Sequence, residues 1–233
     1  MKIVTIARTL NEESIIGKFC ERYGFSDLII ISDGGSTDKT VEIARGFKNV
    51  IVHEDFPHKV YMNAHVPDMY YTNEPLQINF LIEEARKAGA DWIIYDDADC
   101  FPNESLSADA RTLLENCRGD LVEVFRYYIY GTDRYFPKLN EPGPSLWAWR
   151  RSKVSVLCNE EGDPREQNLS YMPVAEHDFK IESFNPPHVL LHYYARSEED
   201  IKNSLYWYAM KDQPKRHPLF GGGPLVPLPD YAK

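Results

Sequence analysis

The hydrophobic residues of the first hundred positions follow two alternating patterns. Short apolar runs of strand length are separated by stretches in which apolar residues recur at the three- and four-residue spacing of a helix. Strands that alternate with helices pair in parallel, so the pattern predicts an α/β fold with a three-layer sandwich and a mainly parallel central sheet. The predicted strands cover residues 2–7, 27–32, 49–53 and 91–96, and the predicted helices cover residues 13–23, 37–46 and 73–88.

From about residue 119 to residue 195 the pattern changes to strands and loops. No linker separates the two halves, 1–100 and 101–213, so we predict a single domain over residues 1–213. Residues 214–233 form a tail rich in Pro and Gly, which we expect to pack in extended form or to be partly disordered. The predicted elements of the second half are a helix over 108–117, strands over 120–129 and 153–157, a strand ending at His192-Tyr193 and a helix beginning at Ser197.

The composition is that of a soluble globular protein. The 233 residues are 43% hydrophobic and 27% charged, which is enough apolar material for one sizeable core. The formal net charge of −10 argues against nucleic acid as a partner, because phosphate binding requires Lys and Arg. None of the four cysteines belongs to a Cys-x-x-Cys pair, which argues against a zinc or redox site. Free thiols suit a reducing cytosol, although four cysteines could also form two disulfides.

No segment of the sequence has the character of a membrane anchor. No run approaches the ~18 consecutive apolar residues that a spanning helix needs. The opening apolar stretch is interrupted by Arg8 and Glu12, too early for a signal peptide. We therefore expect a cytoplasmic protein without a transmembrane segment, whose contact with a membrane, if it has any, is peripheral.

Three carboxylates follow the last strand of the first half. Residues 92–99 read Trp-Ile-Ile-Tyr-Asp-Asp-Ala-Asp, so that an apolar run ends in Asp96, Asp97 and Asp99. In extended geometry Asp97 and Asp99 leave the same face of the strand. Two anionic oxygen donors at the carboxyl end of a strand suit Mg2+ or Mn2+. The alternative is a polar loop that simply follows a buried strand.

A second strand also ends in an acidic motif. Residues 28–40 read Leu-Ile-Ile-Ile-Ser-Asp-Gly-Gly-Ser-Thr-Asp-Lys-Thr, where Asp33 closes the strand and the two glycines after it permit a tight turn. Ser36 or Thr37 is expected to cap the helix that follows. Together with Asn11-Glu12 after the first strand and Asp97-Ala98-Asp99 after the fourth, this order of motifs resembles the family 2 glycosyltransferases. The sequence departs from the family's frequent Asp-Asp motif at Gly34.

The resemblance implies a GT-A fold and a metal-dependent transfer of a sugar from a nucleotide-diphosphate donor to an acceptor hydroxyl, of the hexosyltransferase type. Residues 1–100 would bind the nucleotide and residues 101–213 the acceptor. A bound Mn2+ or Mg2+ ion would supply the positive charge that the anionic donor needs in an acidic protein. The implied metal ligands are Asp97, Asp99 and the late His192, with Asp97 alternatively facing the ribose. The implied donor-binding residues are Ala7, Arg8, Glu12, Asp33, Asp97 and Arg196. Among them, Asp33 would accept a hydrogen bond from the base of the nucleotide and Arg196 would pair with a diphosphate oxygen.

Two of these assignments have plain structural alternatives. His192 could be a buried, hydrogen-bonded histidine, and Arg196 a solvated charge beside the predicted helix. Trp147 and Trp149 alternate along the chain, so in a regular strand both face one side, where they would serve either as a platform for an acceptor sugar or as core residues.

The catalytic base of an inverting enzyme would lie between the acceptor-side strand and the strand that ends at His192. Spacing favours Asp163 or Glu166, with Glu176 and Asp178 as rivals. No Glu-Asp pair opens a helix there, so inversion or retention stays open. The acceptor, whether a glycan, a lipid-linked group or a protein, is not specified by these motifs.

Two other classes of function share this layout. A nucleotidyltransferase would have a similar acidic metal site, but such enzymes usually carry a Gly-rich, basic loop after the first strand, where this chain has Asn11-Glu12-Glu13. A non-catalytic binding protein of the same fold is the other alternative, because a fold does not fix an activity. The retained Asp97, Asp99 and His192 argue against it.

Overall fold

The computed structural model describes most of the first 131 residues and shorter stretches beyond them. The described residues are 1–54, 61–62, 70–71, 74–131, 134–135, 145–151, 179–195, 226–227 and 229–230. The predicted strand over 153–157 and the predicted helix from Ser197 lie outside these residues.

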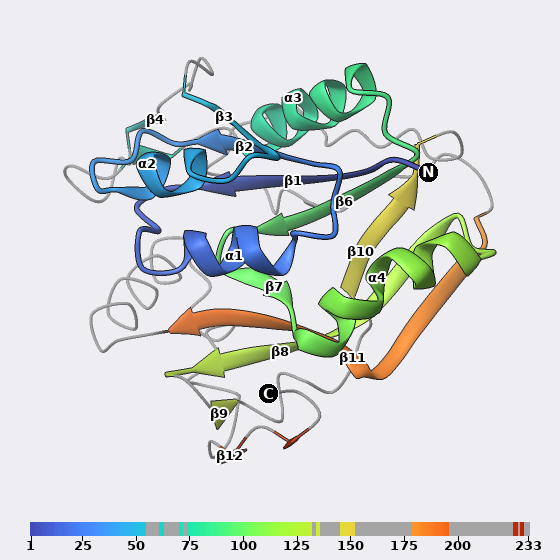
Figure 1. Cartoon of the computed structure of the whole chain (residues 1–233). Coiled ribbons are helices and arrows are strands. Elements are labelled where there is room, and N and C mark those ends of the chain that lie inside the picture. Colours follow the sequence, from blue (N-terminus) through green and yellow to red (C-terminus); the bar gives the residue numbers. More distant parts are fainter. Residues whose placement is uncertain are drawn as a thin grey trace.

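The first half of the chain forms a parallel sheet. Its strands lie in the order β6, β1, β2, β3 and all point the same way, as the arrows of Figure 1 show. Crossover helices connect them, so the predicted alternation of strands and helices is confirmed. The strands are β1 (Ile3–Thr9), β2 (Leu28–Asp33), β3 (Val50–His53) and β6 (Trp92–Asp97), the helices are α1 (Ile16–Arg22), α2 (Thr40–Arg45) and α3 (Glu74–Lys87), and a separate pair is formed by β4 (Tyr61–Met62) and β5 (Tyr70–Tyr71).

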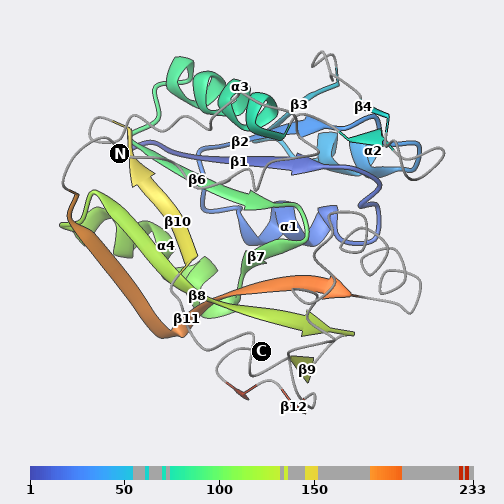
Figure 2. The ribbon, with the colours of Figure 1, turned by 180° about the vertical axis from the view of Figure 1, so that it is seen from behind.

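Helices cover both faces of this sheet, which gives three layers. Successive side chains of β1 point to opposite faces: Val4 and Ile6 pack with α3, whereas Ile3 and Ala7 pack in the core that includes α1 and α2. Helix α4 (Glu104–Asn116) also contributes to the core that includes α1 and α2. Figures 1 and 2 show α3 on one side of the sheet and α1 on the other.

The second half extends the sheet with strands of mixed direction. Strand β10 (Ser145–Arg150) is antiparallel to both β6 and β8 (Leu121–Tyr130) and joins the two. Strand β11 (Ile181–Ala195) runs parallel to β8 and antiparallel to the short β7 (Cys100–Pro102). The edge is completed by β9 (Arg134–Tyr135) and β12 (Val226–Pro227). The predicted fold class, an α/β sandwich around a mixed sheet with a parallel centre, is confirmed.

The expectation that Trp147 and Trp149 face one side is wrong. Leu146 pairs with Glu123 and Ala148 with Val122, so Trp147 is the extra residue of a β-bulge. The bulge turns Trp147 into the core of α1 and α4, and Trp149 into the core of α3 on the opposite face. Both indoles are almost completely buried, so neither offers a platform to an acceptor sugar.

Two helix starts also differ from the predicted ones. Helix α2 begins at Thr40, three residues after the predicted start. Its first amide, that of Thr40, donates to the Asp38 Oδ1 at 2.9 Å, so Asp38 takes the place of the predicted cap, Ser36 or Thr37. Helix α4 begins four residues before the predicted helix, at Glu104, where the Asn103 side chain accepts a hydrogen bond from the Leu106 amide. Within the described part of the chain, no helix combines the length and hydrophobicity needed to cross a membrane.

Candidate functional site

A cavity of about 280 Å³ lies at the carboxyl edge of the parallel strands. Open α/β sheets bind ligands at this edge. Of the residues predicted from the sequence, the structure brings Arg8, Glu12, Asp97, Asp99 and His192 together here. Among the described residues, the cavity is lined by Arg8, Thr9, Leu10, Glu12, Gly34, Gln77, Asp97, Ala98, Asp99 and His192.

Arg8 and Asp97 form an ion pair within this cavity. The two residues are register partners on the adjacent parallel strands β1 and β6, and the Arg8 Nη2 lies 2.7 Å from the Asp97 Oδ1. The hydroxyl of Tyr95 donates to the same oxygen at 2.9 Å and accepts from the Arg8 Nε at 3.1 Å. Desolvation opposes ionisation of Asp97, but the Arg8 guanidinium outweighs it and holds the pKa of Asp97 below its usual value.

Asp99 and His192 form a second pair. Strand β6 ends at Asp97, so Ala98 and Asp99 belong to a turn and not to the extended strand that the sequence suggested. The turn carries Asp99 toward β11, where its Oδ2 lies 3.3 Å from the His192 Nε2, and the Tyr193 amide donates to the Asp99 carbonyl at 2.7 Å. The ring of Tyr128 on β8 packs against His192 with centroids 5.0 Å apart.

Asp96 points away from the cavity into the protein. Its side chain is fully buried, accepts a hydrogen bond from the Tyr23 hydroxyl and lies 3.0 Å from the Arg126 Nη2. The Trp147 indole donates to the Tyr23 oxygen at 3.2 Å. Burial raises the pKa of Asp96 to about 6, although the Arg126 guanidinium opposes that rise. This network joins the end of β6 to α1, β8 and β10.

Asp33 organises the turn that follows β2. Only 2% of the residue is exposed, and its carboxylate accepts hydrogen bonds from the amides of Gly35 and Ser36 and from the Ser36 hydroxyl. Gly35 has a φ of 94°, a conformation that side chains rarely adopt. Asp33 is not among the residues that line the cavity, so its predicted contact with the nucleotide base stays a prediction.

The turn after β2 is tied to the loop after β1 by reciprocal hydrogen bonds. The Asn11 amide donates to the Ser36 Oγ and the Thr37 amide donates to the Asn11 Oδ1, both at 2.8 Å. The Glu12 amide donates to the Thr40 Oγ1 at 2.7 Å. Asn11 has a φ of 54°, which asparagine tolerates better than most residues. The two loops therefore form one rigid wall of the cavity.

Of the remaining predicted site residues, one is buried beside the cavity and the others lie outside the described residues. The side chain of Ala7 is fully buried in the core on the α1 face, so only its backbone could line the crevice. Asp163, Glu166, their rivals Glu176 and Asp178, and Arg196 lie outside the described residues.

Gln77 and Tyr95 are polar residues of the site that the sequence analysis missed. Gln77 of α3 lines the cavity, and its amide nitrogen donates to the Ser32 carbonyl at 3.0 Å. Tyr95 positions Arg8 and Asp97. A signal existed for Tyr95, since it precedes Asp97 by two residues on β6 and must face the same side. The sequence gives a weaker signal for Gln77, which is a polar residue beside the apolar Ile78. The structure shows that both are buried.

Asp99 and His192 have the chemistry and the spacing of two ligands of one cation. Ligand atoms at right angles around an ion with bonds of about 2.1 Å lie about 3 Å apart, close to the 3.3 Å between the Asp99 and His192 atoms. Carboxylate and imidazole together suit Mn2+. Among the described residues, however, no group of three His, Cys, Asp or Glu side chains is arranged to hold a metal ion. Asp97 is instead engaged by Arg8.

Comparison with solved structures shows the fold class. A crystal structure of S. aureus TarS superposes with a TM-score of 0.55 at 15% identity, covering 91% of this chain and 39% of that one. A structure of residues 1–349 of S. aureus TarS gives a TM-score of 0.52 at 17% identity, with 91% and 65% covered. The chain thus spans less than two thirds of the length of either neighbour. The fold is that of the GT-A nucleotide-sugar transferases. Searches with protein-family models and against curated proteins find no match.

Proposed function

We propose that this protein is a glycosyltransferase, similar to those of family 2, that transfers a sugar from a nucleotide-diphosphate donor to an acceptor hydroxyl. One observation carries the proposal. Asp97 and Asp99 at the end of β6 meet His192 of β11 in a cavity at the carboxyl edge of a GT-A fold. Residues so distant in the chain converge on the edge where such a fold binds its ligand.

The residues of the cavity have separate tasks in this reaction. Asp99 and His192, joined by Asp97, would hold a Mn2+ or Mg2+ ion. Such an ion supplies positive charge that stabilises the departing diphosphate. Glu12 and the wall built by Asp33 would hold the nucleoside. Asp97 alternatively accepts from the ribose.

The acceptor side rests on residues outside the described part of the chain. Asp163 or Glu166 is proposed as the base that takes the proton of the acceptor hydroxyl, and Arg196 as a partner of the diphosphate. Since neither Trp147 nor Trp149 is accessible, we propose that Tyr128, whose ring packs against His192, borders the acceptor.

The test is binding followed by turnover. We expect one nucleotide sugar of a panel of UDP- and GDP-sugars to raise the Tm with Mn2+ present, by roughly 5–10 °C when the ligand is at a hundred times its Kd. The same donor should then be hydrolysed slowly or transferred. Asp99→Asn should lower turnover roughly hundredfold or more, because the leaving-group charge loses its support.

A matched control is available on α4. Asp109 lies 3.0 Å from His188 in a second carboxylate–histidine pair, 58% of the Asp109 side chain is exposed, and Asp109 is not among the residues that line the cavity. Asp109→Asn should leave turnover unchanged. Equal losses in Asp99→Asn and Asp109→Asn, or no donor that stabilises the wild type, would refute the proposed function.

A further inference from the structure

The Asp97 carboxylate, a predicted metal ligand, already forms an ion pair with the Arg8 guanidinium. One oxygen, Oδ1, accepts hydrogen bonds both from the Arg8 guanidinium at 2.7 Å and from the Tyr95 hydroxyl at 2.9 Å. A divalent ion on the same carboxylate would lie within a few ångströms of the guanidinium, and like charges at that separation repel strongly in a partly buried site. Arg8 and a metal ion therefore compete for Asp97.

The Arg8 side chain lies in the cavity, and it extends from a backbone that the sheet holds in place. Its backbone is fixed, because β1 is paired on both sides, by β2 and by β6. Its side chain lines the cavity and is only 17% exposed, so an anion entering the cavity would meet it at once. A guanidinium presents parallel N–H donors that match the oxygens of a phosphate at least as well as those of a carboxylate.

We propose that Arg8 is an exchangeable internal cation, which neutralises Asp97 in the nucleotide-free protein and moves to the donor's diphosphate when the donor binds, thereby freeing Asp97 for the divalent cation. This inference rests on the proposed function. It adds that the donor must bind before Asp97 can become a ligand of the cation. The cation site is incomplete until a nucleotide diphosphate enters. Binding of the two ligands is therefore cooperative, with Arg8 as the positioning residue that couples them.

The coupling has a measurable consequence in binding alone. Because linkage is reciprocal, a nucleotide diphosphate tightens Mn2+ by the same factor by which Mn2+ tightens the nucleotide. Removing the Arg8 charge should have opposite effects on the two ligands. Mn2+ should bind the nucleotide-free protein more tightly, since Asp97 is no longer occupied, whereas the nucleotide should bind more weakly.

The experiment is calorimetric titration of Mn2+ with and without saturating UDP or GDP, on wild type, Arg8→Gln and Arg8→Lys. For Arg8→Gln we expect the nucleotide-free Kd for Mn2+ to fall by about tenfold, because a neighbouring positive charge is removed, and the factor by which the nucleotide tightens Mn2+ to fall toward one. Arg8→Lys keeps the charge and should retain weak Mn2+ binding, but with reduced coupling because the fork of donors is lost.

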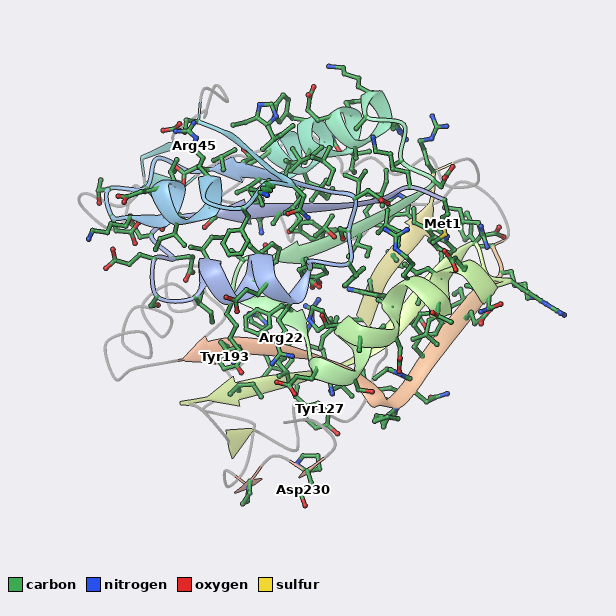
Figure 3. All side chains as sticks on the ribbon, in the orientation of Figure 1. Met1, Arg22, Arg45, Tyr127, Tyr193 and Asp230 are labelled. Atoms are coloured by element: carbon green, nitrogen blue, oxygen red, sulfur yellow. The ribbon has the colours of Figure 1, made fainter. Side chains whose placement is uncertain are left out.

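Arg22 is the matched control. Its side chain is also 17% exposed and forms an ion pair with Glu104 at 2.9 Å. Helix α1 runs back along the sheet, away from the cavity, and Arg22 is its last residue. Arg22 is labelled in Figure 3. Arg22→Gln should leave both the Mn2+ affinity and the coupling as in wild type. The Tm of each variant checks that the fold is retained.

The outcomes separate this inference from the proposed function. If UDP or GDP binds and Arg8→Gln leaves the nucleotide-free Mn2+ affinity unchanged, the exchange is refuted and the proposed function stands. If neither nucleotide binds wild type, the proposed function fails, and the exchange fails with it because the diphosphate does not draw Arg8 away. Tighter Mn2+ binding in Arg8→Gln together with loss of coupling supports the exchange. If neither wild type nor any variant binds Mn2+, the exchange is refuted.

Discussion

The carboxylate of Asp96 lies 3.0 Å from the guanidinium of Arg126 in the interior, while the next residue, Asp97, faces the cavity and Arg8. With Asp99 beside His192, each of the three acidic residues at and just after the end of β6 lies beside a basic residue from a different strand. The partners come from β8, β1 and β11. This pairing explains how an acidic chain brings three carboxylates close together, because Arg126 and Arg8 compensate the charges of Asp96 and Asp97, and Asp99 lies against the imidazole of His192.

The buried pair makes a prediction about stability. Arg126→Met would leave Asp96 buried without its cation, and breaking a buried ion pair in this way typically costs about 3–5 kcal/mol. Urea unfolding at neutral pH measures the loss. Arg45→Met is the control, since Arg45 pairs with Glu54 at the surface with 54% of its side chain exposed, and such pairs are worth about 1 kcal/mol or less. A loss from Arg126→Met no larger than that from Arg45→Met would contradict the buried network.

The same carboxylate predicts a dependence of stability on pH. Burial, opposed by Arg126, raises the pKa of Asp96 from 3.8 to about 6, so between these values the folded state holds a proton that the unfolded chain releases. Stability therefore falls as the pH rises through this window, and the cost is complete above about pH 6. Between about pH 4.5 and about pH 7, wild type should lose more free energy of unfolding than Asp96→Asn, which has no proton to release. Parallel curves for the two proteins would show that Asp96 does not titrate in this range.

The strands and the acidic strand ends could be predicted from the sequence because both are local signals. A buried parallel strand is a continuous apolar run, and Asp33 and Asp97 mark the points where two such runs stop. Parallel strands align their carboxyl ends at one edge, and the family resemblance had implied that Arg8 and Asp97, at two of those ends, both bind the donor. Their adjacent positions on β1 and β6 agree with that reasoning.

The partners from the second half could not be predicted in this way. Arg126 reaches Asp96 only because β8 joins the sheet through β10, and pairing between distant segments leaves no periodic signal in either one. The bulge at Trp147 is a single extra residue that reverses which face the indole occupies, and alternation of hydrophobic residues cannot reveal it when both faces are buried. Tyr193 is a third case, since its contact with Lys18 on α1, at 3.4 Å, depends on how β11 passes beneath that helix (Figure 3).

Asp33 is predicted to have two effects that one substitution would confound. Asp33→Ala removes the hydrogen bonds that close the turn, each worth about 1.5–3 kcal/mol because the acceptor is charged, and also removes the acceptor proposed for the base. We expect a lower Tm and weaker binding of UDP or GDP. Ser36→Ala separates the effects, since it removes the hydroxyl contact and leaves the carboxylate in place. If Ser36→Ala weakens nucleotide binding as much as Asp33→Ala does, Asp33 acts only through the turn.

His192 is predicted to act through the metal and not through the fold. Its Nε2 lies beside Asp99 in the cavity and 15% of its side chain is exposed, whereas neighbouring Leu191 is almost fully buried in the core of β8 and β11. His192→Ala should therefore weaken Mn2+ binding in the presence of nucleotide by roughly tenfold or more, while the Tm of the metal-free protein changes little. Leu191→Ala provides the contrast, because it leaves a cavity in the core that costs about 2–5 kcal/mol and touches no ligand.

Calorimetry of Mn2+ binding and thermal unfolding of both variants distinguish the two roles of His192. A His192→Ala protein that loses metal-free stability as Leu191→Ala does, with Mn2+ affinity intact, would make His192 a structural residue and leave the cation to the aspartates.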